Sequence, residues 1–257
     1  MEQTVSFLPP RKVSNPATHP ELTDALRMSV AVKRANALEL LHAIAEQHDP
    51  AASAVTFANS FGAEDMVLTD LIMSEHLPIE IFSLDTGRLP AETYTLISEV
   101  EQRYDTRLKI FFPESSAVET YVRTHGINAF YNSVELRKAC CGMRKVEPLR
   151  RALAGKKAWI TGLRAAQSTT RSDLPVHEFD EAHGLEKYNP LADWSEQEVW
   201  AYIRIHGVPY NTLHDQFYPS IGCAPCTRSI AVGEDVRAGR WWWESPDSKE
   251  CGLHIKE

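Results

Sequence analysis

The sequence predicts an α/β protein built on a parallel sheet with helices on both faces. Short apolar runs of strand length alternate along the chain with longer segments whose apolar residues recur at helical spacing. Such alternation is typical of parallel strands joined by crossover helices, which cover both faces of the sheet. The 257 residues suit one large domain, and a composition of 43% hydrophobic and 24% charged residues is ordinary for a globular protein.

The expected elements follow one another in a regular order. An amphipathic helix is expected over Leu22–Gln47, where apolar side chains recur at helical spacing. Strands and helices then alternate, and a later helix opens at a capping box, Ser195 to Glu198, and runs to about His206. The strands are expected at Ala54–Ser60, Ile79–Asp85, Thr106–Phe112 and Lys157–Gly162, and the helices between them at Glu64–His76 and Pro90–Tyr104.

The two ends of the chain differ in character from its middle. Residues 1–21 are rich in proline and polar side chains and are expected to form a poorly ordered lead-in. Residues 22–235 are expected to form the single α/β domain. After Gly207 the pattern breaks into Pro, Gly, Trp and Cys, and residues 236–257 are expected to form a mobile tail beyond an irregular segment.

Charge and hydropathy exclude several classes of protein. The formal net charge of −8 argues against general nucleic-acid binding, because it implies no broad basic surface. No apolar run approaches the roughly 18 residues needed to span a bilayer. The N-terminal sequence also lacks the charged start and apolar core of a signal peptide. We therefore expect a cytoplasmic protein that does not enter membranes.

Four of the five cysteines fall into two pairs. Cys140 and Cys141 are adjacent in KACCGMRK, and Cys223 and Cys226 form a C-x-x-C pair in CAPC. In a reducing compartment such a set favours a metal site or catalysis over disulfides. Adjacent cysteines can ligate two irons of a cubane cluster more easily than one tetrahedral zinc ion. An iron–sulfur centre is therefore favoured, with zinc and a redox switch as alternatives.

The fifth cysteine, Cys251, stands alone near the C-terminus in DSKECGLHIKE. The neighbouring Lys249, His254 and Lys256 would lower the pKa of an exposed thiol and make it a competent nucleophile. A tail could also carry this thiol into a site and later present it to another protein. The residues alone leave the nucleophile and an idle thiol on a frayed tail as equal alternatives.

Three segments that follow expected strands carry residues suited to an anionic ligand. Ser60–Asp65 joins a strand to a helix, where main-chain amides can hold phosphate. Arg164 and Arg171 follow another strand in GLRAAQSTTR, and Asp85–Arg88 follows a third. Ligands of a parallel sheet bind at the carboxyl ends of its strands, so these segments are expected to meet there. Taken singly, each is also what a solvated loop or a strand–turn–helix joint contains.

In combination, the motifs resemble one family. The set KACCGMRKVEPL, GCAPCTR, VRAGRWWWE and KECGLH is similar to the assimilatory adenylyl-sulfate reductases of bacteria and plants. These belong to the reductases that act on adenosine 5′-phosphosulfate (APS) or on its 3′-phosphorylated form (PAPS). SFGAEDMVL and LDTGRL look like the family's nucleotide-binding elements, and GLRAAQSTTR like its arginine loop. The resemblance covers nearly everything from about residue 50 and implies an adenine nucleotide alpha-hydrolase-like fold.

The resemblance also implies roles for individual residues. The four paired cysteines would ligate one 4Fe–4S cluster, and Cys251 would be the catalytic nucleophile. Lys145, which follows the cysteine pair, would lie close to both the cluster and the substrate. The expected cluster ligands are Cys140, Cys141, Cys223 and Cys226, and the expected substrate contacts are Ser60, Lys145, Arg164, Arg171, Arg237, Arg240 and His254.

The reaction that the resemblance implies is a two-stage reduction. Cys251 would attack APS, release AMP and carry an S-sulfocysteine, from which thioredoxin would release sulfite for cysteine biosynthesis. Family members with the paired cysteines mostly favour APS, so APS is the expected substrate, with acceptance of PAPS left open; homo-oligomers are common in the family. Two rivals fit less well. A tRNA thiolase would need a Ser-Gly-Gly loop that Ser60-Phe-Gly does not supply, and an iron–sulfur sensor would leave Cys251 without a role.

Overall fold

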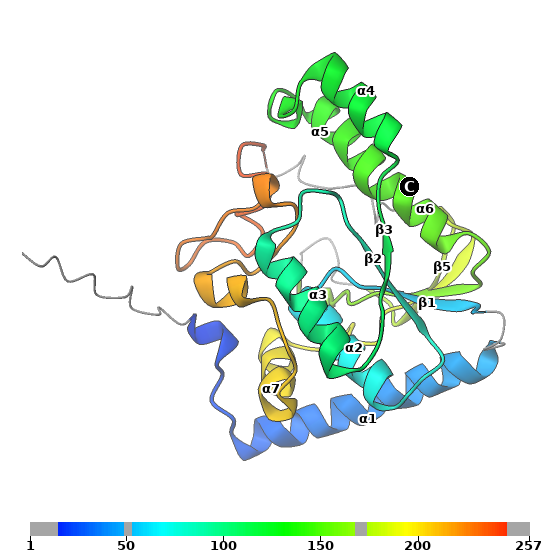
Figure 1. Cartoon of the computed structure of the whole chain (residues 1–257). Coiled ribbons are helices and arrows are strands. Elements are labelled where there is room, and N and C mark those ends of the chain that lie inside the picture. The colour runs from blue at the N-terminus through cyan, green and yellow to red at the C-terminus, as the bar shows by residue number, and fades with distance from the viewer. Residues whose placement is uncertain (1–14, 49–52, 168–173, 246–257) are drawn as a thin grey trace, which may run out of the picture.

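The computed structural model describes residues 15–48, 53–167 and 174–245, and it confirms the predicted α/β architecture. A six-stranded sheet has the order β3-β2-β1-β4-β6-β5 (Figure 1). Every neighbouring pair is parallel except β5–β6, so the sheet has one antiparallel edge strand. The strands are β1 (Val55–Ala58), β2 (Glu80–Leu84), β3 (Lys109–Phe111), β4 (Ala158–Ile160), β5 (His177–Asp180) and β6 (Leu185–Tyr188).

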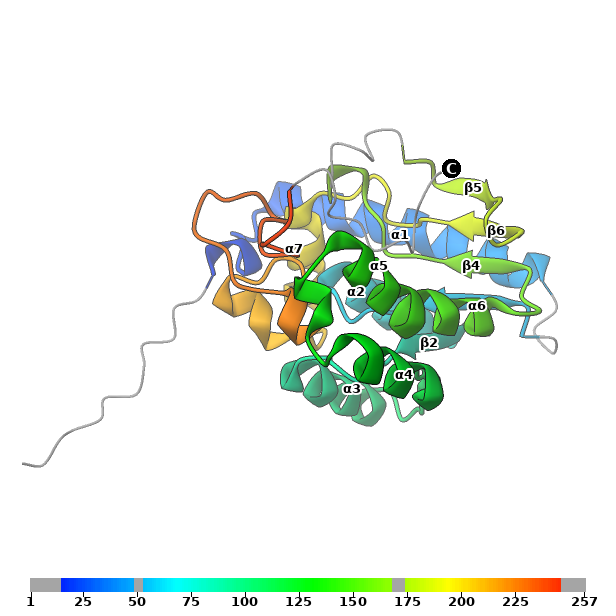
Figure 2. The ribbon, with the colours of Figure 1, turned by 90° about the horizontal axis from the view of Figure 1, so that it is seen from above.

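Helices cover both faces of this sheet, as predicted. Successive residues of a strand point to opposite faces, and β4 shows this directly. Ile160 packs into the larger hydrophobic core beneath α1, α2, α3 and α7, whereas Trp159 packs with Leu149 and Leu153 of α6 on the other face (Figures 1 and 2). The α-helices are α1 (Asp24–Gln47), α2 (Ala63–Ser74), α3 (Ala91–Arg103), α4 (Ser115–His125), α5 (Val134–Cys141), α6 (Glu147–Leu153) and α7 (Glu196–His206).

Local signals explain where the long helices begin. The Thr23 side chain accepts a hydrogen bond from the main-chain N–H of Leu26 at the start of α1. At α7 the predicted capping box is present: Ser195 accepts from the N–H of Glu198, and the Glu198 side chain accepts from the N–H of Ser195. Each contact satisfies a main-chain donor that has no partner inside the helix. The sequence therefore located these helices to within a few residues.

Several short elements were not predicted. The hairpin β5–β6 and the helices α4, α5 and α6 are additional to the expected elements. Between α5 and α6 the chain forms a π-helical turn, Gly142–Val146, directly after the cysteine pair. Part of the expected lead-in is also held in place. Asn15 and Thr18 are hydrogen-bonded to the main chain of His214 and the carboxylate of Asp215, at 3.1 and 2.7 Å.

The strand order creates a crevice. From β1 the chain moves outward through β2 to β3, and it then crosses back to β4 on the other side of β1. At such a reversal the loops after neighbouring strands diverge, and ligands of open α/β sheets bind in the gap at the carboxyl ends. None of the helices in the described part of the chain is long and apolar enough to cross a membrane.

Candidate active site

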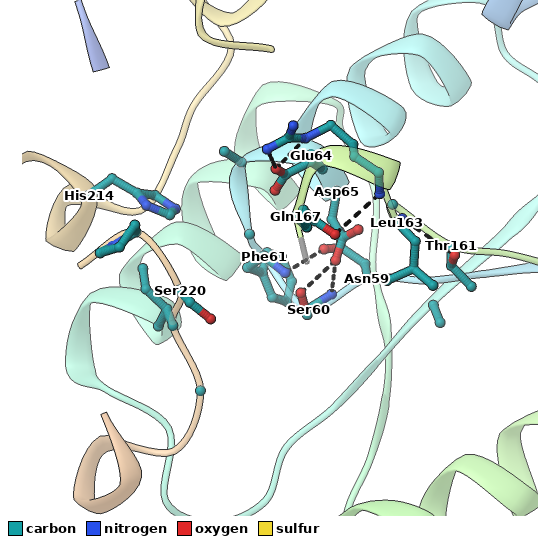
Figure 3. A pocket seen from close by; sticks show the side chains of 18 of the residues that line it. Asn59, Ser60, Phe61, Glu64, Asp65, Thr161, Leu163, Gln167, His214 and Ser220 are labelled. Carbon is teal, nitrogen blue, oxygen red and sulfur yellow. Dashed lines mark hydrogen bonds and ion pairs between the residues drawn. The ribbon is translucent and has the colours of Figure 1, made fainter. Parts of the chain in front are cut away.

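A cavity of about 470 Å³ opens at the carboxyl ends of β1, β2 and β4 (Figure 3). Its floor is made by the turns that follow these strands, and the segments around Ser220 and Arg240 form part of its wall. This volume lies in the range of small-molecule sites. Three of the predicted anion-binding segments thus meet in one place, as the position of strand ends in a parallel sheet requires.

The turn after β1 is held by side chains of its own segment. The main-chain N–H and the hydroxyl of Ser60 both donate to the same carboxylate oxygen of Asp65, each at 2.6 Å. Asn59 accepts from the N–H of Phe61 at 2.7 Å, which supports the left-handed conformation of Phe61, with φ 62°. No side chain caps the start of α2 at Gly62. The first main-chain N–H groups of α2 therefore lie in a segment that lines the cavity, and an anion is favoured there.

Asp65 ties two turns of the cavity floor together. Its carboxylate holds Ser60 after β1 and also accepts from the main chain of Gly162 after β4. Any Cβ at Gly162 would collide with the Asp65 carboxylate, so the close approach requires glycine. Burial is the main reason that the pKa of Asp65 is raised to about 6, although its hydrogen bonds with Ser60 lower it. Asp65 belongs to the expected anion-binding segment Ser60–Asp65, but the sequence alone assigned it no role.

Arg164 lines the cavity, but its guanidinium is held by neighbours. It lies within 2.8 Å of a Glu64 carboxylate oxygen and donates to the main-chain carbonyl of Trp194 at 3.3 Å. The side chain is almost completely buried. Through the contact with Glu64, Arg164 links the turn after β4 to the start of α2. Direct contact of Arg164 with a substrate stays a prediction.

Part of the cavity wall is cationic. Lys145, Arg237 and Arg240, which the resemblance implies as substrate contacts, all line it. Arg240 donates to the hydroxyl of Ser220 at 3.2 Å and stacks over the ring of Trp241 at 4.7 Å. A Cβ at Gly222 would lie 2.7 Å from the guanidinium carbon of Arg240, so glycine makes room for this side chain. An anionic group that enters here meets positive charge in a largely buried setting, which strengthens the attraction.

The four paired cysteines come together in a second, smaller pocket of about 20 Å³ beside the cavity. Lys145 lines both the cavity and this cysteine pocket, so the two sites are adjacent. The hydroxyl of Thr86 lies 3.2 Å from the sulfur of Cys223, and Arg144 donates to the main-chain carbonyl of Thr86 at 2.5 Å. The cysteine pocket is lined by Arg88, Phe130, Arg137, Cys140, Cys141, Arg144, Lys145, Cys223, Pro225 and Cys226.

The thiols of this pocket affect one another's ionisation. Burial, together with the charges of Cys223 and Cys141, raises the pKa of Cys226 to about 12, while Lys145 and Arg240 act in the opposite direction. Burial also raises the pKa of Cys140. Four thiols this close, two of them buried and two partly buried, cannot all ionise without a cation to neutralise them. A metal centre supplies that charge and displaces the protons.

The donor set is chemically compatible with an iron–sulfur cluster. Four thiolates are the ligands of a 4Fe–4S cluster, and the four cysteines that line the pocket are free thiols. A zinc ion with Zn–S bonds of about 2.3 Å would draw all four sulfurs onto one point. Among the residues that the structure describes, no group of three or more His, Cys, Asp or Glu side chains is arranged around a single ion. The four cysteines thus have the donor chemistry of a cluster, and the cluster itself stays a prediction.

Three predicted site residues lie outside the described residues. Arg171 belongs to 168–173, and Cys251 and His254 belong to 246–257. Gln167, the last described residue before the first of these segments, lines the cavity. Of the other predicted residues, Ser60, Lys145, Arg164, Arg237 and Arg240 line the cavity, and the four cysteines share their own pocket.

Some residues of the site carried no usable signal in the sequence. Arg137 is fully buried and forms a two-pronged ion pair with Glu244, at 2.9 and 2.7 Å. His214 lines the cavity from a short turn that nothing in the sequence marked. Arg144 lies in the motif KACCGMRK and Thr86 in LDTGRL, yet their contact joins positions 58 residues apart. Only the tertiary structure could reveal these pairings.

The fold is that of an α/β protein with a cavity at its strand ends, and residues 54–229 match the family model of the phosphoadenosine phosphosulfate reductase domain. The match covers more than half of the chain, which therefore belongs to this family. It is an enzyme of the oxidoreductase class that acts on a sulfur group.

Relatives narrow the family further and bear out the resemblance seen in the motifs. Adenosine 5′-phosphosulfate reductase of Allochromatium vinosum is 60% identical over 89% of this chain and 88% of its own length. The enzyme of the same name from Burkholderia cepacia is 58% identical over 90% of this chain and 91% of its own.

Solved structures agree on the fold. Phosphoadenylyl-sulfate reductase from Candida auris, in a phosphate complex, superposes with a TM-score of 0.63 at 28% identity. The superposition covers 82% of this chain and 99% of that one. Yeast FAD synthetase superposes with a TM-score of 0.58 at 14% identity, over 85% of this chain and 73% of its own, and shows the shared fold alone.

Proposed function

We propose that this enzyme reduces APS to sulfite and AMP, with Cys251 as nucleophile and thioredoxin as reductant. One observation carries the proposal. A nucleotide-sized cavity at the strand ends has a cationic wall, and Lys145 joins that wall to a pocket of four cysteines. An adenine nucleotide with a terminal sulfonate matches both the size and the charge of this arrangement. The name shared by the relatives from Allochromatium vinosum and Burkholderia cepacia supports the choice of APS.

In the first step the Cys251 thiolate attacks the sulfur of the sulfonate. A sulfur–sulfur bond forms, the bond between sulfur and the phosphate oxygen breaks, and AMP leaves with the electron pair. The sulfonate oxygens are negatively charged and repel a thiolate. Lys145, Arg237 and Arg240 offset this charge and hold the sulfonate in line, and we assign the same task to Arg171 and His254.

In the second step a thiol of thioredoxin attacks the Cys251 sulfur. Sulfite leaves, and a mixed disulfide joins the two proteins. The second thioredoxin thiol then attacks that disulfide, which frees Cys251 and leaves oxidised thioredoxin. The dithiol supplies both electrons of the reduction. We place these thiol-exchange reactions in the cytoplasm, where thiols are kept reduced. We assign them to sulfate assimilation for cysteine biosynthesis.

Cys140, Cys141, Cys223 and Cys226 would hold one 4Fe–4S cluster, whose bound charge supplies a fixed electrostatic centre beside the cavity. Because the two thiols of the reductant already supply the electrons, the chain's own residues can complete the reaction without electron transfer from a metal. Thr86 and Arg144 lie against the cysteines and brace the turn after β2. Lys145 lines both sites, so a change in the charge of the cysteine pocket would change the electrostatic potential at the Lys145 side chain.

Mass spectrometry of the intact, anaerobically purified protein tests the proposal. APS or PAPS is added without thioredoxin, and the expected result is a sulfonate adduct on Cys251 from APS. An adduct from both nucleotides would keep the mechanism and widen the substrate range to PAPS. A Cys251→Ser variant that keeps its brown colour is the matched control and should carry no adduct. No adduct on the brown wild-type protein would refute Cys251 as the nucleophile.

A further inference from the structure

His214 presents an unexplained buried atom to the active-site cavity. The residue lies in the 3₁₀ turn η7 (Thr212–Gln216), is 3% exposed and lines the cavity. Its ring is directed toward the cavity in Figure 3, and no described residue gives its Nε2 a hydrogen-bond partner. A buried polar atom without a partner costs free energy comparable to a lost hydrogen bond. Something that enters the cavity is therefore expected to satisfy it.

The ring is held in a defined orientation. It packs edge-to-face against Trp200, with ring centres 5.2 Å apart. Its main-chain N–H donates to the carbonyl of Asn211 at 3.0 Å, and its own carbonyl accepts from the side chain of Asn15 at 3.1 Å. Contacts with α7 and with Asn15, together with the bond inside the turn itself, thus fix the turn. The unpartnered nitrogen is a feature of a rigid wall and points to a built recognition site.

The chemistry of the ring decides what it can bind. Burial lowers the pKa of His214, although the charges of Glu64 and Asp215 and a hydrogen bond with the main chain of Tyr218 oppose this shift. The ring is therefore neutral at pH 7, with one donor and one acceptor nitrogen. A hydrogen bond to the main chain raises the pKa of histidine when a ring N–H donates to a carbonyl oxygen, because that bond favours the protonated ring. We assign the proton to Nδ1 on this basis, which leaves Nε2 as an acceptor.

Two carboxylates, Glu64 and Asp215, act on the His214 ring. Glu64 is already paired with Arg164, and Asp215 accepts hydrogen bonds from Thr18 and Tyr210. An acceptor nitrogen beside two carboxylates attracts a neutral donor and repels a phosphate or sulfonate. Lys145, Arg237 and Arg240 line the same cavity and supply its positive charge, whereas His214 supplies a neutral acceptor. A ligand with one anionic end and one neutral end fits it in a single direction.

We propose that His214 Nε2 accepts a hydrogen bond from a neutral O–H or N–H group of the nucleoside and thereby directs the phosphosulfate toward the cationic wall. This inference rests on the proposed function, since it takes the bound molecule to be an adenine nucleotide. The donor is a ribose hydroxyl or the adenine amino group, and both belong to the same ligand. A site built to pair such a group rejects an analogue that lacks it, because the buried acceptor is then left without a partner.

Equilibrium binding of AMP and three analogues to the intact, anaerobically purified protein tests the proposal. The analogues are 2′-deoxy-AMP, 3′-deoxy-AMP and purine riboside 5′-monophosphate, each of which lacks one candidate donor. We expect one of the three to bind wild-type protein roughly tenfold to a hundredfold more weakly than AMP. His214→Phe should weaken AMP by a similar factor and should bind that same analogue no worse than it binds AMP. His214→Gln, which keeps an acceptor, should recover part of the loss.

His206→Phe is the matched control, because this histidine contacts Tyr202 and does not line the cavity. It should bind AMP as wild type does. Three analogues that bind wild-type protein as tightly as AMP would overturn the inference, as would His214→Phe that binds AMP unchanged; both would leave the proposed function intact. AMP that fails to bind wild-type protein would overturn both together. If the 3′-deoxy analogue is the one that binds weakly, PAPS should bind less tightly than APS, because its 3′-phosphate oxygens would face the His214 lone pair.

Discussion

The buried ion pair between Arg137 and Glu244 makes a sharp stability prediction. Arg137 lies on α5, three residues before Cys140, and Glu244 ends the tryptophan-rich segment that leads to the C-terminal residues. Both side chains are almost fully buried, at 0% and 3% exposed, and two hydrogen bonds join them. The Arg137 guanidinium also stacks over the ring of Trp241 at 4.9 Å. The pair therefore connects the cysteine helix to the segment that carries Arg240.

Glu244→Ala should be strongly destabilising. It leaves the Arg137 guanidinium buried without its counter-charge, which typically costs about 3–5 kcal/mol. Urea lowers the free energy of unfolding by about 3 kcal/mol per molar for a chain of this size, so the unfolding midpoint should fall by roughly 1–2 M. Arg137→Met with Glu244→Leu, which removes both charges, should recover much of this loss, because no unpaired charge remains.

A second two-pronged pair in the same region is the matched control. Arg228 and Glu234 are joined at 3.0 and 3.2 Å but are 39% and 35% exposed. Water and salt screen such a pair, so Glu234→Ala should change the midpoint far less than Glu244→Ala does. Both variants are unfolded anaerobically in urea and followed by tryptophan fluorescence. Equal shifts in the two would refute the argument that burial makes the Arg137–Glu244 pair decisive, and so would a double variant as unstable as Glu244→Ala.

Three further predictions concern single residues. Gly222→Ala should displace the Arg240 guanidinium and weaken APS binding about tenfold or more, whereas Gly142→Ala, whose Cβ meets nothing within 4 Å, should not. The raised pKa of Asp65 means that the folded protein keeps a proton which the unfolded chain loses between about pH 4 and 6. Wild-type stability should therefore fall by up to about 3 kcal/mol relative to Asp65→Asn as pH rises through this window, and a pH series of urea midpoints that runs parallel for the two proteins would contradict this. Ser195→Ala removes the capping box of α7 and should cost about 1 kcal/mol in the same urea assay; an unchanged midpoint would show that the cap is dispensable.

Much of the fold was readable from the sequence because its signals are local. The period of apolar residues locates α1, and the capping box locates α7, each within a few neighbouring positions. Strand-length apolar runs located β1 to β4 for the same reason. The short pieces β5, β6, α5 and α6 escaped prediction. Such pieces take their stability from packing against the rest of the protein more than from their own sequence.

The sequence by itself determined the chemistry of this protein: its α/β class, the two cysteine pairs, the cations of the cavity and the family to which the motifs belong. The tertiary structure alone decided which of these groups meet. The strand order places the turns after β1, β2 and β4 around one cavity, and Lys145 between that cavity and the cysteine pocket. It also turned Arg164 toward Glu64 and left His214 Nε2 facing the cavity. Contacts between residues distant in the chain depend on how whole elements pack, and no local pattern encodes that packing.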